Sequence, residues 1–439
     1  MELGNERVSA VGGDRLIPTP DPIARDYLLL ALRLDKLRPG LVDEYIGPAD
    51  IPAQVAAEEP FAAGRLREQA SSMLSRLQTE ALEADRGRWL RAQLVSLEAQ
   101  AMALAGDPLP YADCAACFFD ITAERASEAV FDAAADDLGR LLPPGEGGET
   151  VSERLSAWES RFAIDPDRIP AVADWVMGET RERADRLFGL PIGEGIDSVY
   201  ISGEPWTVSS RYQGGCRTVL HVNTDMLRTP GDLIHMAAQE GYPGRHTERA
   251  WRERRLIDDM GRLEASVFLL NTPEALISAG LAYLGERMVA SDEQMHAMLL
   301  EIYARAGLAI TADPGAASDA AETQVRIRRA VGNLRAVTAN AAFMLHADGV
   351  PRAEVALYLR HRLLTTRERA EVQLGLIEDP VYRTQVLAAY QGERLLNRWF
   401  ELGPTSERVD RFGRFMREQL TPGFLARELS SINFGEMPW

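Results

Sequence analysis

One change of pattern does most to constrain the fold of this chain. Hydrophobic residues recur at helical spacing along most of its 439 residues, and this periodicity is interrupted once, between Asp197 and Asp225. In that interval the segments VYISG, WTVSSRY and RTVLHVN are rich in β-branched residues and are separated by glycine-rich turns. The pattern predicts a mainly α fold with a small antiparallel sheet of about three strands and a hairpin at Gly214-Gly215.

The helices around this sheet are predicted from hydrophobic periodicity and helix-breaking residues. After the sheet they cover residues 230–241, 244–263, 272–289, 291–308, 318–347, 351–363, 366–376, 379–402 and 405–420. With 46% hydrophobic residues, the chain can bury a large core. We expect a helical N-terminal region, residues 1–195, and a catalytic-like region, residues 196–439, joined in one continuous elongated unit.

Composition argues against two classes of partner. The chain has 48 basic and 66 acidic residues, a net charge of -18, and therefore lacks the basic footprint of a nucleic-acid-binding protein. No uncharged apolar stretch of about 18 residues predicts a membrane span. The N-terminal MELGNERVSAVGGDR has no basic start followed by an apolar run, so no secretory signal is predicted. Three cysteines suit a reducing compartment, and we expect a cytoplasmic protein.

Two of these cysteines, Cys114 and Cys117, form a single Cys-x-x-Cys. Metal and redox sites built on this motif normally show a second pair or a βαβ context, and neither follows here. We interpret both as small apolar residues on a helix.

The segment IHMAAQEGYPGRHTE, residues 234–248, carries the strongest chemical signal. A zinc-binding helix uses His-Glu-x-x-His, which places two His side chains one turn apart on one face. Counting from Gln239, the one-turn position is Pro243, which cannot bind a metal. His246 lies seven residues on and shares that face, but an unbroken helix would put it about 10 Å further along the axis. Pro243 and Gly244 are expected to break the helix and could fold His246 back toward Gln239.

This segment resembles the His-Glu-x-x-Pro-Gly-His-His signature of the bacterial family known as domain of unknown function 885. Other parts of the chain resemble the same family, so the likeness covers nearly all of it: DKLRPGLVDEYIGPADI, CFFDITAE, RERADRLFGLP, YQGGCRTVLHVNTD, NTPEALISAGLA and YRTQVLAAYQGERLLNRW. Members look like zinc metallopeptidases of the mostly helical class related to thermolysin. The resemblance therefore implies a large helical peptidase-like fold with a small sheet next to the active-site helix.

Carried over residue by residue, the family's metal site is damaged. Glu240 matches the general-base glutamate, and His246 matches the second His of the final pair and would be the remaining metal ligand. Gln239 stands in place of the first His ligand, and Arg245 in place of the first His of the final pair. The family's glutamate ligand falls on Ala279, within Ser-Ala-Gly.

All three changes disfavour zinc. A glutamine amide donates weakly to a metal, alanine offers no ligand atom, and Arg245 brings a permanent positive charge. At about 4 Å, repulsion between two unit charges is a few kcal/mol at a protein-like dielectric. We therefore expect no cofactor in the family manner. Zinc would require a shifted site, such as one formed by His235, Glu240 and His246.

Several further residues are candidates for the same cleft or for structural roles. His221 is interpreted as a sheet residue, Glu274 as part of a helix start, and Glu286 as too far from Ala279 to replace its ligand. Glu240 and Arg245 are expected to pair, with Glu248 nearby.

Three more side chains are predicted to line the cleft. Tyr390 matches a family segment with a tyrosine near the active site, where it would donate to an oxyanion; packing between helices is the alternative. Arg211 and Tyr212, on a strand beside the active helix, would line the groove that docks a peptide.

Three functions remain open from the sequence. The first is a pseudoenzyme, a metallopeptidase-like protein whose cleft binds a peptide or small molecule. The second is an active hydrolase with a shifted metal site or with metal-free chemistry at Glu240 and His246. The third is a helical scaffold whose outer surface carries the function. The sequence does not specify an oligomeric state.

Overall fold

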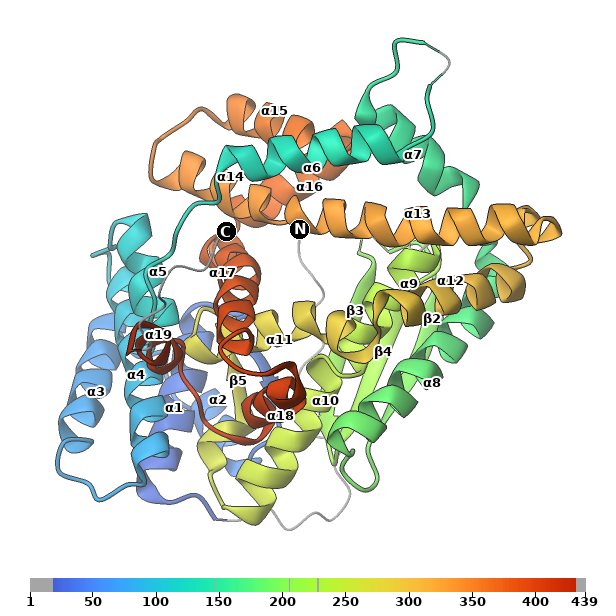
Figure 1. Ribbon diagram of the computed structural model, residues 1–439. Helices are drawn as coiled ribbons and strands as arrows, with labels where there is room; N and C mark the ends of the chain where they lie inside the picture. The colour runs from blue at the N-terminus through green and yellow to red at the C-terminus, as the bar shows by residue number, and fades with distance from the viewer. Residues whose placement is uncertain (1–18, 146, 205, 227–228, 432–439) are drawn as a thin grey trace.

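The computed structural model describes residues 19–145, 147–204, 206–226 and 229–431, and it confirms a mainly α fold with small sheets (Figure 1). The N-terminal stretch that lacks a secretory pattern lies outside these ranges. Among the described helices, none is long and apolar enough to cross a membrane.

Within the described residues, eight α-helices precede the three-stranded sheet: α1 (Pro22–Leu37), α2 (Asp50–Ala57), α3 (Ala63–Arg76), α4 (Ala84–Leu104), α5 (Tyr111–Phe119), α6 (Glu128–Leu141), α7 (Val151–Arg161) and α8 (Ile169–Phe188). Helix α1 begins where the Asp21 carboxylate accepts a hydrogen bond from the backbone of Ala24, and α7 begins with a capping box between Thr150 and Glu153. Cys114 and Cys117 are free and lie on α5, as interpreted from the sequence.

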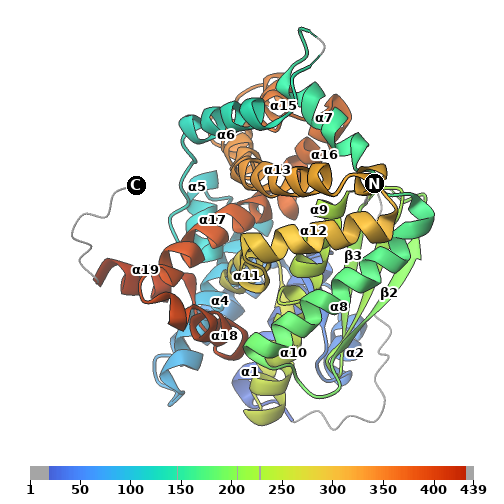
Figure 2. The same ribbon diagram turned by 45° about the vertical axis from the view of Figure 1, so that its right-hand side comes forward.

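The expected sheet is present and contains β2 (Gly195–Ile201), β3 (Val208–Gly214) and β4 (Arg217–Asn223). The turn at Gly214-Gly215 joins β3 and β4 as an antiparallel hairpin, as predicted. The spatial order is β2-β4-β3, and β2 pairs with β4 in parallel, so the sheet is mixed rather than wholly antiparallel. Helix α8 runs alongside this sheet (Figure 2).

A second, two-stranded sheet was not predicted. It pairs β1 (Val42–Tyr45) with β5 (Val267–Leu269) in antiparallel fashion. The expectation that the chain is purely helical after residue 225 is therefore wrong. The three residues of β5 are all buried. So short an apolar run has no alternation of apolar and polar residues by which the sequence could tell a strand from a helix.

The C-terminal half closely follows the predicted helices. It contains α11 (Pro273–Val289), α12 (Asp292–Ala306), α13 (Pro314–Asn333), α14 (Ala336–His346), α15 (Arg352–Arg362), α16 (Arg367–Glu378), α17 (Tyr382–Phe400), α18 (Arg408–Arg417) and α19 (Pro422–Ser431). The helix expected over residues 318–347 is divided at residues 334–335 into α13 and α14.

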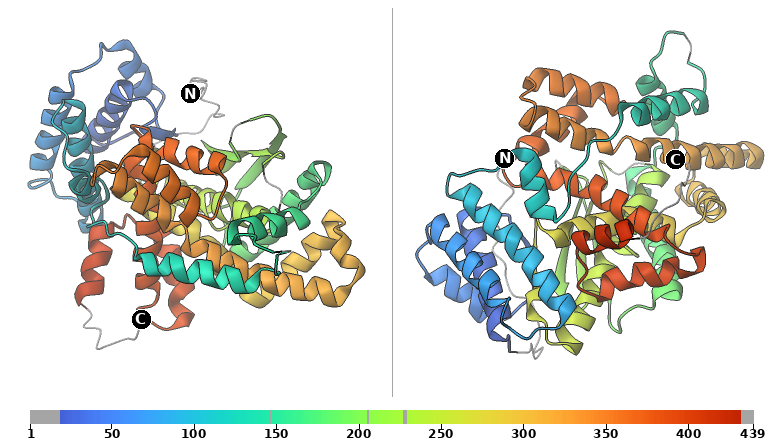
Figure 3. Two further views of the ribbon diagram at one scale, coloured as in Figure 1. Left: turned by 90° about the horizontal axis from the view of Figure 1, so that it is seen from above. Right: turned by 60° about the vertical axis from the view of Figure 1, so that its left-hand side comes forward.

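Buried apolar side chains form two large clusters. One joins α1, α3 and α4 to β5, and the other extends from α5 through α8 and the sheet to α19. The helices α1 to α4 group at one side of the molecule (Figures 1 and 3). These two clusters separate between α4 and α5 and not near residue 195. The domain boundary expected near residue 195 stays a prediction.

Helices α11 and α17 cross with their backbones in close approach. Gly280 of α11 and Gly392 of α17 face each other, and a Cβ atom on Gly392 would collide with the carbonyl oxygen of Leu276. Glycine at both positions therefore lets the two backbones approach closely. This crossing fixes the position of α11, which carries Ala279.

Candidate functional site

The segment that resembles a metallopeptidase signature forms two helical pieces separated by a break. Helix α9 (Pro230–Met236) continues into a π-helical turn, η2 (Ala237–Gly241). The chain then breaks at residues 242–244, as Pro243 and Gly244 predicted, and α10 (Arg245–Arg252) begins. A second π-helical stretch, η3 (Glu253–Asp259), follows α10. Such π-turns within helices often occur at functional sites.

Gly244 lets the second piece fold directly against the first. A Cβ atom at this position would collide with the carbonyl oxygens of Ala238 and Gln239, so only glycine fits. The start of α10 therefore lies against the backbone of Gln239. This contact brings Arg245 next to Glu240.

Glu240 and Arg245 form the predicted pair, although a loose one. Arg245 Nε lies 3.8 Å from Glu240 Oε2, which is ion-pair distance but too long for a hydrogen bond. The Glu240 side chain is 14% exposed and that of Arg245 is 41% exposed. The nearby carboxylate of Glu240, followed by those of Asp43 and Glu44, raises the pKa of Arg245. The guanidinium is therefore a fixed positive charge with donors still open to solvent.

His246 does not face this pair. Its side chain is fully buried, Nδ1 lies 2.8 Å from Thr218 Oγ1, and Nε2 lies 2.9 Å from Glu194 Oε2. Tyr242 donates its hydroxyl hydrogen to the same Glu194 oxygen at 2.6 Å, and Arg181 Nε donates to the other oxygen at 2.8 Å. The network ties α10 to β4, to α8 and to the loop before β2.

The electrostatics of this network favour a neutral imidazole. Burial lowers the pKa of His246, and the nearby Glu194 only partly offsets it. Burial would raise the pKa of Glu194, but hydrogen bonds from His246 and Tyr242 outweigh it, and the pKa falls. With Nε2 protonated, His246 donates to Glu194 and accepts from the Thr218 hydroxyl. Both ring nitrogens are then occupied, so His246 as placed here does not offer a lone pair to a metal.

Ala279, the position of the expected glutamate ligand, lies on α11 and packs against the larger apolar cluster. Its neighbour Ser278 donates a hydrogen bond to Glu248 Oε2 at 2.5 Å, which links α11 to α10. Ala279 itself is partly exposed. Three partly exposed positions lie at the break, and we call them the signature surface: Gln239, its chain neighbour Glu240, and Arg245, which faces Glu240. Glu248, expected in the cleft, is buried.

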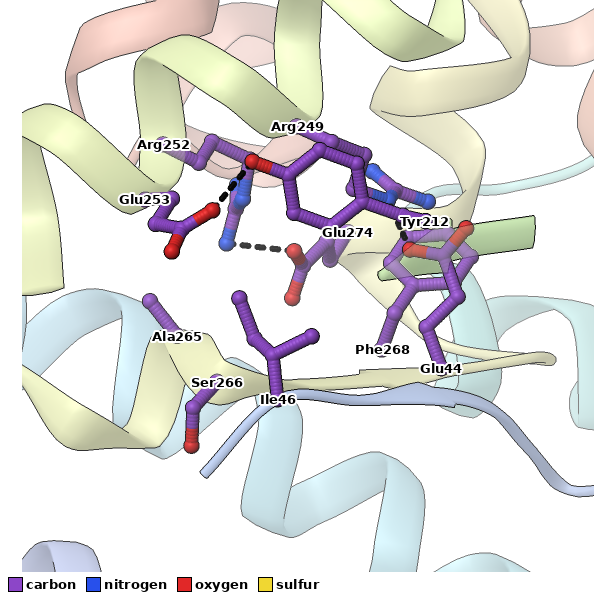
Figure 4. A pocket seen from close by; sticks show the side chains of 10 residues that line it. All are labelled: Glu44, Ile46, Tyr212, Arg249, Arg252, Glu253, Ala265, Ser266, Phe268 and Glu274. Carbon is purple, nitrogen blue, oxygen red and sulfur yellow. Dashed lines mark hydrogen bonds and ion pairs between the residues drawn. The ribbon is translucent and has the colours of Figure 1, made fainter. Parts of the chain in front are cut away.

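Ionisable side chains from β1, α10, η3 and α11 form a largely buried set, which we call the buried charge cluster; Figure 4 shows all of its members except Glu248. Five members are buried, namely Glu248, Arg249, Arg252, Glu253 and Glu274, and the side chain of the sixth, Glu44, is 11% exposed. Arg249 Nε donates to Glu44 at 2.6 Å, lies 3.2 Å from Glu248, and stacks 3.6 Å from the Phe268 ring centroid. Arg252 pairs with Glu274.

The buried charge cluster holds more acids than bases, and its carboxyl groups respond differently. Glu253 accepts from the Tyr212 hydroxyl, from Gly215 N at 2.8 Å and from Cys216 N at 3.1 Å. Glu274 lacks such a set of donors, and burial raises its pKa to about 7 despite Arg252. Burial also raises the pKa of Glu44. Within the cluster, burial therefore favours the protonated form of Glu274 and of Glu44.

Arg211 and Tyr212 do not line one cleft together. Successive residues of a strand point to opposite faces, and Tyr212 is buried with its hydroxyl on Glu253, whereas Arg211 is exposed. The prediction that both side chains line the groove is wrong for this reason.

His235 belongs to a different group of side chains. Its Nδ1 lies 3.3 Å from Glu286 Oε2, and Arg328 from α13 holds the same carboxylate. Burial would raise the pKa of Glu286, but Arg328 and His235 outweigh it and keep that pKa low. The shifted metal site of His235, Glu240 and His246 is therefore not assembled, because each of these residues faces a different partner.

Tyr390 lies on α17, in a different part of the chain from Glu240. Burial raises the pKa of its phenol, and the charged groups that act on it are Arg394, Glu124 and Glu393. Tyr390 packs against the larger apolar cluster, in agreement with the alternative of a tyrosine packed between helices.

The residues present do not fit a zinc ion in the family manner. Gln239 precedes Glu240, the Arg245 guanidinium lies 3.8 Å from its carboxylate, and both ring nitrogens of His246 are held by Thr218 and Glu194. Across the described ranges, no three His, Cys, Asp or Glu side chains converge to hold a metal ion. His221 lies in β4, as interpreted from the sequence.

Comparisons with known proteins leave the family open. No protein-family model matches the chain, and no curated protein matches it. Two solved structures resemble it in part. A "putative lipoprotein" from Colwellia psychrerythraea shares 14% identity over 94% of this chain and 77% of its own, with a TM-score of 0.45. A "putative lipoprotein of unknown function" from Shewanella oneidensis shares 11% over 92% and 82%, with a TM-score of 0.48. TM-scores below 0.5 assign neither fold nor function.

Sequence reasoning missed the residues that surround His246 and Arg249. Glu194 lies 52 residues before His246, and Glu44 lies 205 residues before Arg249. Glu194 belongs to no segment singled out above, and Glu44 lies in the family-like segment DKLRPGLVDEYIGPADI, but no local signal pairs Glu194 with His246 or Glu44 with Arg249.

Proposed function

We propose that this chain is a metallopeptidase-like protein that has lost the metal site of that lineage and that binds a peptide or small molecule at its signature surface. One observation carries the proposal: Glu240, at the position of the general base, faces the guanidinium of Arg245 at 3.8 Å. A permanent cation beside Glu240 opposes binding of a divalent cation, yet it leaves charged donors and an acceptor side by side.

Exposure and hydrogen bonding support ligand binding at this surface. Arg245 remains 41% exposed and makes only a long contact with Glu240. Charge-assisted hydrogen bonds between such groups and a ligand are stronger than neutral ones. A peptide main chain presents both carbonyl oxygens for Arg245 and N–H groups for Glu240. The ligand class thus matches the two charges that the surface exposes.

The alternative, a metal-free hydrolase that uses Glu240 and His246, has weaker support. His246 is fully buried, with Thr218 on one nitrogen and Glu194 on the other. A proton-transfer group must reach the substrate within hydrogen-bond distance. Glu240 alone would have to activate water, with the Arg245 guanidinium 3.8 Å away.

Binding of short fluorescent peptides of mixed sequence, measured by anisotropy, tests the proposed function. Arg245→Gln should weaken binding about 10- to 100-fold, as expected for losing a charged hydrogen bond. Arg211→Gln is the matched control, since it makes the same change at an exposed arginine on β3. Equal binding by both variants would place the site elsewhere, on the outer surface. Peptide cleavage that disappears in Glu240→Gln would support the hydrolase instead.

A further inference from the structure

Strand β1 lies between α10, which carries part of the signature surface, and the start of α17. Glu44 of β1 accepts a hydrogen bond from Arg249 Nε of α10 at 2.6 Å (Figure 4). In the turn before β1, a Cβ atom on Gly40 would lie 3.9 Å from the side chain of Val381, the residue that precedes α17. The strand is therefore held on one side by α10 and on the other by the segment that leads into Tyr382, the first residue of α17.

Asp43 is the extra residue of a β-bulge in this strand. Val42 pairs with Leu269 and Glu44 pairs with Phe268, so Asp43 has no partner in β5. A bulge interrupts the alternation of side chains along a strand and redirects the extra side chain, and bulges are frequent next to active sites. Asp43 is exposed, and its carboxylate makes no hydrogen bond or ion pair within the described part of the chain. Its negative charge is therefore available to a ligand.

Charge interactions place Asp43 close to both Arg245 and Tyr382. The carboxylate of Glu240 does most to raise the pKa of Arg245, and that of Asp43 is the next carboxylate to do so. Burial raises the pKa of Tyr382, and the negative charges of Asp43 and Asp379 raise it further. The positive charge of Arg245 acts on the same phenol and lowers its pKa. Because such interactions weaken with distance, these side chains of β1, α10 and α17 lie at one place on the molecule.

We propose that Asp43 and Tyr382 extend the signature surface and select a ligand that carries a primary ammonium group. Asp43 supplies a carboxylate, and the half-buried Tyr382 supplies an aromatic ring, which are the two kinds of group that attract an ammonium. The charges agree with this ligand, since Asp43 and Glu240 are negative and only Arg245 is positive. A peptide meets all of these groups when its ammonium lies at Asp43 and a carbonyl oxygen lies at Arg245. The inference rests on the proposed function, because it names the ligand class of the same surface.

A primary ammonium group comes from the amino terminus of a peptide or from a lysine side chain, and three peptides of otherwise equal sequence separate these sources. The first has a free amino terminus and no lysine, the second is acetylated and has no lysine, and the third is acetylated and contains one lysine. All carry a fluorophore at the carboxyl end, and binding to the wild-type protein is measured by anisotropy. We expect the peptide without an ammonium to bind about 10-fold more weakly than at least one of the other two. The tighter of those two identifies the source of the ammonium.

Two substitutions assign this preference to the proposed residues. Asp43→Asn removes the charge with little change of shape, and Asp113→Asn is the matched control at an exposed aspartate of α5. Asp43→Asn should abolish the preference for the ammonium-bearing peptide, whereas Asp113→Asn should keep it. Tyr382→Leu removes the ring and should reduce the preference. Circular dichroism and thermal unfolding check that each variant is folded.

The outcomes separate this inference from the proposed function. Equal binding of all three peptides by the wild type, with weaker binding of all three by Arg245→Gln, would overturn the inference and leave the proposed function standing. The same preference in Asp43→Asn as in Asp113→Asn would also overturn it. If Asp43→Asn does not fold, an unchanged preference in Tyr382→Leu overturns it instead. Absence of binding by any of the peptides would count against the proposed function itself and would overturn this inference with it.

Discussion

Replacing Glu274 with glutamine should make the folded protein less sensitive to rising pH. The Glu274 side chain is 4% exposed at the start of α11, and burial raises its pKa from 4.5 to about 7. The folded state therefore keeps this proton at pH values where the unfolded chain has released it. Stability from this group is complete below the unfolded pKa and is lost as the pH rises through the folded one.

The size of the effect follows from the two pKa values. The difference between 4.5 and about 7 corresponds to about 3 kcal/mol in the free energy of unfolding above neutral pH. Glutamine resembles the protonated glutamate side chain in shape and cannot ionise. The variant should therefore not lose this stability as the pH rises. Arg252, the partner of Glu274, is present in both proteins and still contacts a side-chain oxygen.

Urea unfolding at about pH 5 and about pH 8 measures this difference. All other ionisable groups are the same in the two proteins, so their contributions cancel when the wild type is compared with Glu274→Gln. The free energy of unfolding of the wild type, relative to Glu274→Gln, should fall by about 3 kcal/mol over this interval. Glu354→Gln, an exposed position on α15, is the matched control and should follow the wild type. The same pH dependence in wild type and Glu274→Gln would refute a raised pKa in the buried charge cluster.

Two further substitutions test the contacts that hold the site in place. Gly392→Ala should destabilise the protein by about 1–3 kcal/mol, because the new Cβ would press on α11. Its control is Gly375→Ala, in an exposed part of α16 with open space around it, which should stabilise the protein slightly. Thermal unfolding compares the two variants, and equal effects would contradict the close crossing. Tyr242→Phe removes a buried hydrogen bond to Glu194 and should lower the free energy of unfolding, measured in urea, by about 1–3 kcal/mol. Tyr358→Phe is the control and should cost less, because the hydrogen bond from its hydroxyl to Glu128 is exposed. A smaller loss for Tyr242→Phe than for Tyr358→Phe would contradict a structural role for the network.

Local sequence patterns predicted helices and turns well where a periodic segment is long or a turn has characteristic residues. The helices over residues 273–289 and 382–400 and the hairpin at Gly214-Gly215 follow from spacing and turn chemistry. The parallel pairing of β2 with β4 was missed, because it joins segments that are not adjacent in the chain. The π-turn of η2 was also missed, since a single extra residue in a helix leaves little trace in hydrophobic periodicity.

The candidate site was predictable in its residues and less so in their orientation. Glu240 and Arg245 pair as expected, because both lie beside the break that Pro243 and Gly244 predicted. The direction of His246 depends on Glu194 and Thr218, which are distant in sequence. Tyr390 could not be placed relative to Glu240 without knowing how α17 crosses α11 at Gly392.

Zinc content of the wild-type protein tests the central claim most directly. The protein is dialysed with zinc chloride, freed of excess metal and measured by elemental analysis beside Glu240→Gln. Because Arg245 faces Glu240 and His246 is bonded to Thr218 and Glu194, we predict only residual zinc, equal in both proteins. Stoichiometric zinc in the wild type that is lost in Glu240→Gln would contradict the account.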